Sequence, residues 1–108
     1  MHDLLHNIVM EDKFYEKIQK TEEICCSYFN VHRQLIMNGD RHSHVAICRG
    51  LLFYILHKQY DIPTSVISEY YHCTKRTVFW QCNKVSNLIC IYKQYNAMLE
   101  EICELLDK

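Results

Sequence analysis

The chain has 108 residues, a formal net charge of −1 and 49% hydrophobic residues, but only two glycines and one proline. This length fits one domain with one core, and the scarcity of turn-forming residues argues against a sheet of short strands, so we expect an all-α, compact helical bundle. No apolar run approaches the ~18 residues of a membrane span, and Asp3, Glu11 and Asp12 argue against a secretory signal.

The N-terminal segment carries two helical patterns. Residues 3–20 form an expected N-terminal helix, with apolar residues at helical spacing and a polar back face. The apolar positions are Leu4, Leu5, Ile8, Val9, Phe14, Tyr15 and Ile18. Thr21 is followed by Glu22 and Glu23, so we expect Thr21 to cap a second helix that ends near Phe29.

The next stretch predicts a short helix, a turn and a long helix. Residues 32–37 indicate a short helical turn, and Asn38-Gly39-Asp40 is the clearest turn signal in the chain. Residues 43–59 carry apolar side chains at helical spacing, with Ser43 as the expected N-cap. Tyr60-Asp61-Ile62-Pro63 ends this helix, because the residue before a proline avoids the α region.

Two short helices separated by three or four residues follow the proline, which is the layout of a helix-turn-helix. We expect Thr64 to cap the first helix and His72-Cys73-Thr74 to form the break. The second helix begins at Lys75 and continues to Val85, and we interpret Trp80 as a partly buried core ring. The residues expected to face the core are Val66, Ile67, Tyr70, Val78, Cys82 and Val85. Those expected to point outward are Lys75, Arg76, Phe79, Gln81 and Lys84.

Residues 88–108 predict a C-terminal helix with a heptad pattern. The repeat consists of Leu88, Tyr92, Tyr95, Leu99, Ile102 and Leu106, flanked by Ile91, Met98 and Leu105. A stripe this wide is more often packed on the domain's own core. A coiled coil is the alternative, so a homodimer through this helix stays open.

The charges are unevenly distributed along the chain. Residues 41–84 hold six Lys and Arg against two Asp and Glu, whereas the segments on either side are both acidic. A local basic patch of this kind favours contact with phosphate. Together with the two-helix pattern, it predicts sequence-specific binding of double-stranded DNA.

The start of the second helix suits such a contact. Its free N–H groups and positive dipole end favour phosphate. Lys75 and Arg76 add charge, and Thr74 and Thr77 add hydroxyl donors on side chains short enough to let the helix enter a major groove. Arg76 is suited to a bidentate contact with a guanine edge.

The sequence contains only weak patterns for metal binding, disulfide bonds or catalysis. The seven cysteines, an odd number, mostly lie in apolar stretches, which indicates reduced, core-filling thiols in a cytoplasmic protein. His42-x-His44 and His72-Cys73 offer donor atoms, but no cysteine pair has zinc-ligand spacing. No glycine-rich phosphate loop or nucleophile motif stands out. We therefore expect no enzyme, metal, cofactor or membrane partner.

Several segments from about residue 18 onward occur in the order of a known family. They are Ile18-Gln19-Lys20-Thr21, Cys25-Cys26-Ser27-Tyr28-Phe29-Asn30-Val31, Val45-Ala46-x-x-Arg49, Ser65-x-Ile67-Ser68-x-x-Tyr71 and Lys75-Arg76-Thr77-Val78. In this order they resemble the C-terminal DNA-binding domain of DnaA, the bacterial chromosomal replication initiator. The family signature G-G-R-D-H-T-T-V is here one residue shorter, without the glycine pair or the aspartate.

The resemblance implies a fold akin to the Trp repressor and a role for each candidate residue. It places Arg41 in a loop that enters the minor groove, Arg49 and Lys84 at phosphates, and Thr64 and Ser65 near the backbone. It assigns base contact to Lys75, Arg76 and Thr77. The candidate DNA-binding residues also include Thr74 and Gln81.

The resemblance does not extend to a nucleotide-binding module. The expected function is therefore that of a stand-alone regulator of replication or transcription that binds no nucleotide. The alternative is a helical protein-interaction module that has lost DNA binding and holds its partner through the C-terminal stripe.

Overall fold

A computed structural model of the chain describes the backbone of residues 2–108 and the side chains of residues 12–108. Over the described backbone the chain forms helices and no strand, which confirms the predicted all-α class. The elements are α1 (His2–Phe29), α2 (Arg33–Met37), α3 (Ser43–Tyr54), the π-helix η1 (Ile55–Gln59), α4 (Thr64–Tyr70), α5 (Lys75–Ile91) and α6 (Lys93–Leu106). Within this part of the chain, no helix is both long and apolar enough to cross a membrane.

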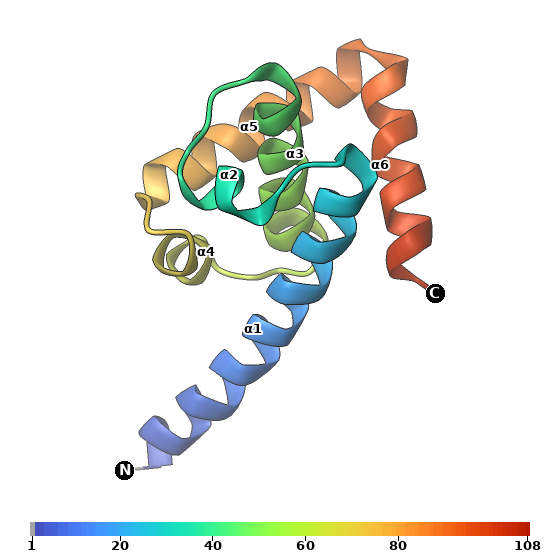
Figure 1. The fold of residues 1–108 in the computed structure, drawn as a ribbon. Coiled ribbons are helices and arrows are strands. Elements are labelled where there is room, and N and C mark those ends of the chain that lie inside the picture. Colours follow the sequence, from blue (N-terminus) through green and yellow to red (C-terminus); the bar gives the residue numbers. More distant parts are fainter. Residues whose placement is uncertain (1) are drawn as a thin grey trace.

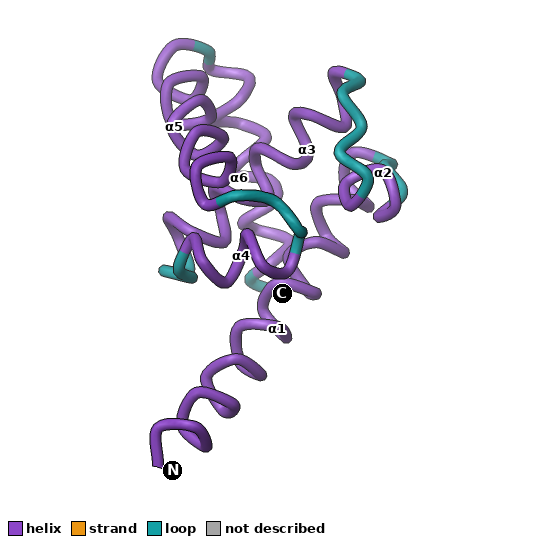
Figure 2. The backbone as a smooth tube through the Cα atoms, turned by 90° about the vertical axis from the view of Figure 1, so that its left-hand side faces the viewer, coloured by secondary structure: helices purple, strands orange, loops and turns teal. Residues whose placement is uncertain are grey.

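α3 is the central helix of the bundle. It packs against α1, α2 and α5, and α6 packs on α1 and α5. The first half of α1 extends away from the other helices in both views (Figure 1, Figure 2). The core residues of α3 are Val45, Cys48, Leu51, Leu52 and Phe53. The core therefore lies around α3, and α5 covers one side of it.

α1 is one continuous helix where two were predicted. Thr21, the expected N-cap, lies inside the helix and is fully buried. Its hydroxyl donates to the carbonyl oxygen of Lys17, one turn earlier, at 2.7 Å. A threonine can satisfy its hydroxyl in this way within a helix, so the prediction of a break at Thr21 is wrong.

The other predicted helix starts are partly confirmed. The short helix at residues 32–37 is confirmed as α2, and Gly39 takes a φ of +72° in the predicted turn after it. Ser43 and Thr64 are wrong as N-caps, since each is the first residue of its helix. The capping positions are His42 and Pro63, which make no side-chain capping bond.

The C-terminal stripe is divided between two helices. α5 continues to Ile91, Tyr92 is extended, and α6 begins at Lys93, so a single helix over residues 88–108 is wrong. The expected packing on the chain's own core is confirmed for Leu99, Ile102 and Leu106, which are buried. Among the residues of the heptad repeat and those that flank it, the exposed ones are Ile91, Tyr92 and Leu105.

All seven cysteines are free, and three of them, Cys25, Cys48 and Cys82, are buried in the core. Burial raises the pKa of the Cys25 thiol to about 12 and that of Cys82 to about 11. Both side chains are therefore neutral near pH 7 and fill space as small apolar groups.

A buried carboxylate ties three parts of the fold together. Glu22 of α1 is only 5% exposed. Its Oε2 accepts a hydrogen bond from Nε of Arg33 at 2.7 Å, and its Oε1 accepts one from the hydroxyl of Tyr71 at 2.8 Å. The ring of Tyr71 packs on Phe53 of α3, with centroids 5.2 Å apart. Glu22 thus joins α1 to the start of α2 and to the residue that follows α4.

Replacing Tyr71 tests this network. Tyr71→Phe keeps the ring but removes a donor from a buried carboxylate, so we expect the free energy of unfolding to fall by about 1–2 kcal/mol. Tyr70→Phe is the matched control, because its hydroxyl accepts only a longer, exposed bond of 3.3 Å from Arg33; its loss should stay within about 0.5 kcal/mol. Urea unfolding followed by circular dichroism measures both, and equal small losses would contradict the assigned role of Glu22.

α3 and α5 approach each other closely at Gly50. A Cβ atom added there would lie 2.8 Å from Cγ2 of Val85, which is buried on α5. Val85 is β-branched and stiff, so it cannot easily turn aside. A glycine is therefore required at this position by the close helix crossing.

The same crossing gives a second stability prediction. Gly50→Ala normally stabilises a helix by about 1 kcal/mol, but here we expect overpacking to dominate and stability to fall by about 1–2 kcal/mol. Adding Val85→Ala should make room for the new methyl group, so the double variant should lose less than the sum of the two single losses. Thermal unfolding of all four proteins measures the coupling, and strict additivity would count against the contact.

Candidate nucleic-acid interface

α4 and α5 are joined by a tight turn over residues 71–74. His72 takes a positive φ of 54° at the bend, and the N–H of Cys73 donates to the carbonyl oxygen of Ser68 at 2.9 Å. The two helices pack against each other. The predicted core face of α5 is confirmed at Val78, Cys82 and Val85, whereas on α4 Ile67 is buried and Val66 and Tyr70 are half-buried.

Thr74 fixes the start of α5. Its Oγ1 accepts a hydrogen bond from the N–H of Thr77 at 3.1 Å and lies 2.9 Å from the hydroxyl oxygen of Thr77. The first turn of α5 contains no acidic residue. The two threonines therefore hold the helix start in place, and the positive end of the helix is not neutralised locally.

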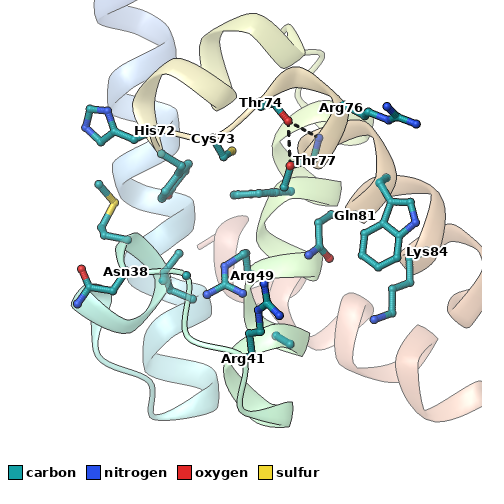
Figure 3. A pocket seen from close by; sticks show the side chains of 17 residues that line it. Asn38, Arg41, Arg49, His72, Cys73, Thr74, Arg76, Thr77, Gln81 and Lys84 are labelled. Atoms are coloured by element: carbon teal, nitrogen blue, oxygen red, sulfur yellow. Dashed lines mark hydrogen bonds between the residues drawn. The ribbon is translucent and has the colours of Figure 1, made fainter.

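A groove of about 760 Å³ lies between α5 and the segment that runs from α2 to α3. Four cationic side chains line it, and no aspartate or glutamate does. The cations are Arg41, Arg49, Arg76 and Lys84. Figure 3 shows Arg41 and Arg49 on the side opposite Thr77, with Arg76 pointing outward from the start of α5. In a chain of net charge −1, positive charge is therefore concentrated on this face.

The two arginines on the α3 side have different environments. Arg49 is half-buried, and its Nη2 donates to the carbonyl oxygens of Asp40 at 2.8 Å and Leu35 at 3.2 Å. Burial lowers the pKa of the Arg49 guanidinium below its usual value. Arg41 is exposed and lies on the loop that Arg49 anchors. Arg49 therefore holds the loop, and Arg41 is the more accessible cation.

Asp40 contributes to the same loop. Its Oδ1 accepts hydrogen bonds from the backbone N–H of His42 at 2.9 Å and from Nδ1 of the same residue at 2.7 Å. These bonds hold the pKa of the Asp40 carboxyl below its ordinary value. The nearby carboxylate is thus engaged with His42 and does not line the groove.

The groove brings together seven of the ten predicted site residues. They are Arg41, Arg49, Thr74, Arg76, Thr77, Gln81 and Lys84. The other three lie outside it: Lys75 is exposed on the first turn of α5, and Thr64 and Ser65 begin α4. Ser65 is exposed and Thr64 is half-buried.

Trp80 was missed as a member of this site. The expectation of a partly buried core ring is wrong, because Trp80 is 56% exposed and lines the groove. Nζ of Lys84 lies 5.2 Å from the centroid of its ring. Helical geometry contained the signal, since Trp80 lies about 200° around the helix from Val78, opposite the buried face.

Metal ligands do not gather in the part of the chain whose side chains are described. No group of three or more His, Cys, Asp or Glu there could hold an ion. Comparison with known proteins adds no assignment, since no protein-family model matches the chain and no curated protein matches it significantly.

The bend at His72 gives a prediction about the turn. A positive φ is unfavourable for a residue with a Cβ and costs a glycine nothing, so His72→Gly should raise the free energy of unfolding by up to about 1 kcal/mol. His44→Gly is the matched control, because His44 is exposed and helical in the first turn of α3; it should lose about 0.5–1 kcal/mol. Chemical unfolding measures both, and a loss at His72 as large as that at His44 would contradict the strained turn.

Proposed function

We propose that this protein binds double-stranded DNA with the face formed by α5 and the loop before α3. The observation that carries the proposal is the groove lined by four cations and no carboxylate, in a protein of net charge −1. Cations gathered on one face release counterions when they meet phosphates, which favours binding to DNA.

Arg49 holds the loop before α3, and the other three cations have different places relative to the DNA. Arg76 points outward from the start of α5, where side chains of a recognition helix reach base edges in the major groove. Lys84 lies two turns further along and is suited to phosphate contact. Arg41 lies on the loop that precedes α3, from which it can reach an adjacent minor groove.

Four other candidate residues lie on α4 and α5. Lys75 and Thr77 lie beside Arg76, and Thr64 and Ser65 at the start of α4 are suited to contact with the DNA backbone. The same assignments follow from the resemblance to the DnaA C-terminal domain. By that resemblance, the protein acts as a stand-alone regulator of replication or transcription.

A second candidate function rests on a different observation. Phe79, Trp80 and Ile91 of α5 are more than half exposed, at 55%, 56% and 68%. Exposed apolar side chains on one helix are also typical of a surface that binds another protein. Salt dependence separates the two functions, because counterion release makes DNA binding weaken steeply with salt and an apolar protein interface lacks this effect.

Lys84 and Lys58 provide a matched pair for the DNA proposal. Lys84→Ala should weaken binding to all duplexes about equally and make the slope of log affinity against log salt shallower by about 0.9, because one phosphate contact is lost. Lys58→Ala removes the same charge from an exposed lysine that does not line the groove, so its slope should match that of the natural protein. Fluorescence anisotropy of a labelled duplex over a salt series measures both.

Arg76→Ala tests sequence reading separately. It should lower the discrimination between a selected duplex and a random one by about 1–3 kcal/mol. Arg41→Ala should instead lower the preference for A·T-rich flanks. Uniform weakening in every variant would leave a non-specific binder, and no duplex binding at low salt would overturn the proposed function.

A further inference from the structure

The outer face of α5 combines aromatic rings with positive charge. Arg76, Trp80 and Lys84 are spaced four residues apart, so they form one row along the helix. Trp80 is 56% exposed, and the neighbouring Phe79 is 55% exposed. The Trp80 ring is thus flanked by a cation one turn away on each side, and Nζ of Lys84 lies 5.2 Å from the ring centroid.

The fold does not need either ring for its own core. α5 already buries Val78, Cys82 and Val85 against the rest of the chain. Phe79 and Trp80 lie about 100° apart around the helix, and each leaves more than half of its surface in water; exposed apolar surface is found at binding sites. The rings therefore require an explanation outside the packing of this chain.

The faces of a fully paired duplex do not offer a partner for these rings. Stacked base pairs cover each other's faces, and the major groove presents only base edges and the methyl group of thymine. An unpaired base presents its whole face, on which a tryptophan or phenylalanine ring can stack. A phosphate next to that base would then lie beside the positive charge of Lys84, and Arg76 lies one turn away on the other side of the ring, where the adjoining duplex begins.

We propose that Trp80 is a stacking platform for unpaired bases of a DNA strand whose phosphates contact Lys84, next to a duplex whose base edges Arg76 contacts. The protein then favours DNA that contains unpaired bases next to a duplex over DNA that is paired throughout. This inference rests on the proposed DNA binding and adds the structural class of DNA that is preferred. Charge complementarity favours this occupant, because α5 contains no acidic residue from Lys75 to Ile91.

Trp80 is the only tryptophan in the chain, so its fluorescence reports on stacking directly. The test compares three DNA molecules of equal length and charge: a paired duplex, a duplex with an unpaired bubble, and the same bubble with abasic sites in place of the unpaired bases. We expect the bubble to quench Trp80 fluorescence and to bind more tightly than the other two. The abasic bubble matches it in flexibility and phosphate charge but offers no base to stack.

Substitutions then assign the preference to the ring. Trp80→Ala should weaken binding to the bubble about tenfold or more, as expected for loss of a stacked base, and should weaken binding to the paired duplex clearly less, because no base stacks on the ring there. Trp80→Phe should retain part of the preference, since it keeps an aromatic face. Circular dichroism of each variant checks that the helical fold is intact. If Trp80→Ala is not folded, the test is the preference for bubble over paired DNA in Trp80→Phe, which should be smaller than in the natural protein.

The outcomes separate this inference from the proposed function. If paired and bubble DNA bind equally and Trp80→Ala weakens both to the same extent, the stacking platform is refuted while DNA binding stands. If none of the three DNA molecules binds, both proposals fail. If Trp80 fluorescence instead changes with protein concentration alone, the rings pack on a second copy of the chain, and that result also overturns the platform.

Discussion

The carboxylate of Glu22 is a charge inside an apolar core, and the fold is arranged to satisfy it. A buried charge without partners costs several kcal/mol, so each of its oxygens requires a donor. Arg33 at the start of α2 and Tyr71 after α4 supply these donors. Both elements also contribute to the walls of the groove, through Ile36 of α2 and through Tyr71 itself. The ion pair and hydrogen bond of Glu22 therefore help to hold two walls of the groove in place.

One face of α5 packs against the rest of the chain, and the other faces are exposed to solvent. Its buried face is small and apolar, and Gly50 lets it approach α3 closely. Thr74 fixes where the helix begins, and the left-handed bend at His72 fixes its direction relative to α4. The cations and rings of the outer face are thus held on a backbone fixed by packing and capping. A site on such a support needs little reordering when a ligand binds, which lowers the entropic cost of binding.

Local patterns predicted the helical class, the turn at Gly39 and the α4–α5 pair, because helical spacing and turn residues act over a few positions. These patterns gave a wrong prediction at Thr21, which was expected to start a helix. Its hydroxyl instead donates to the carbonyl oxygen of Lys17 inside a longer helix, and tertiary packing decides between these two conformations. They also failed at Tyr92, where α5 ends without a nearby glycine or proline. The charge pattern selected residues that the fold brings to one groove, but Arg41 and Lys84 are too far apart in sequence for any local rule to show that they meet.

The break at Tyr92 has a consequence for the order in which the protein folds. Because the chain turns there, α6 returns to pack on α1, and the hydroxyl of Tyr28 donates to the carboxylate of Glu101. α1 and α6 are therefore neighbours, and the contact between Tyr28 and Glu101 closes a long loop of the chain. Contacts of such long sequence separation form late and slow the folding reaction. During synthesis, the side of α1 that α6 covers stays open until α6 has left the ribosome.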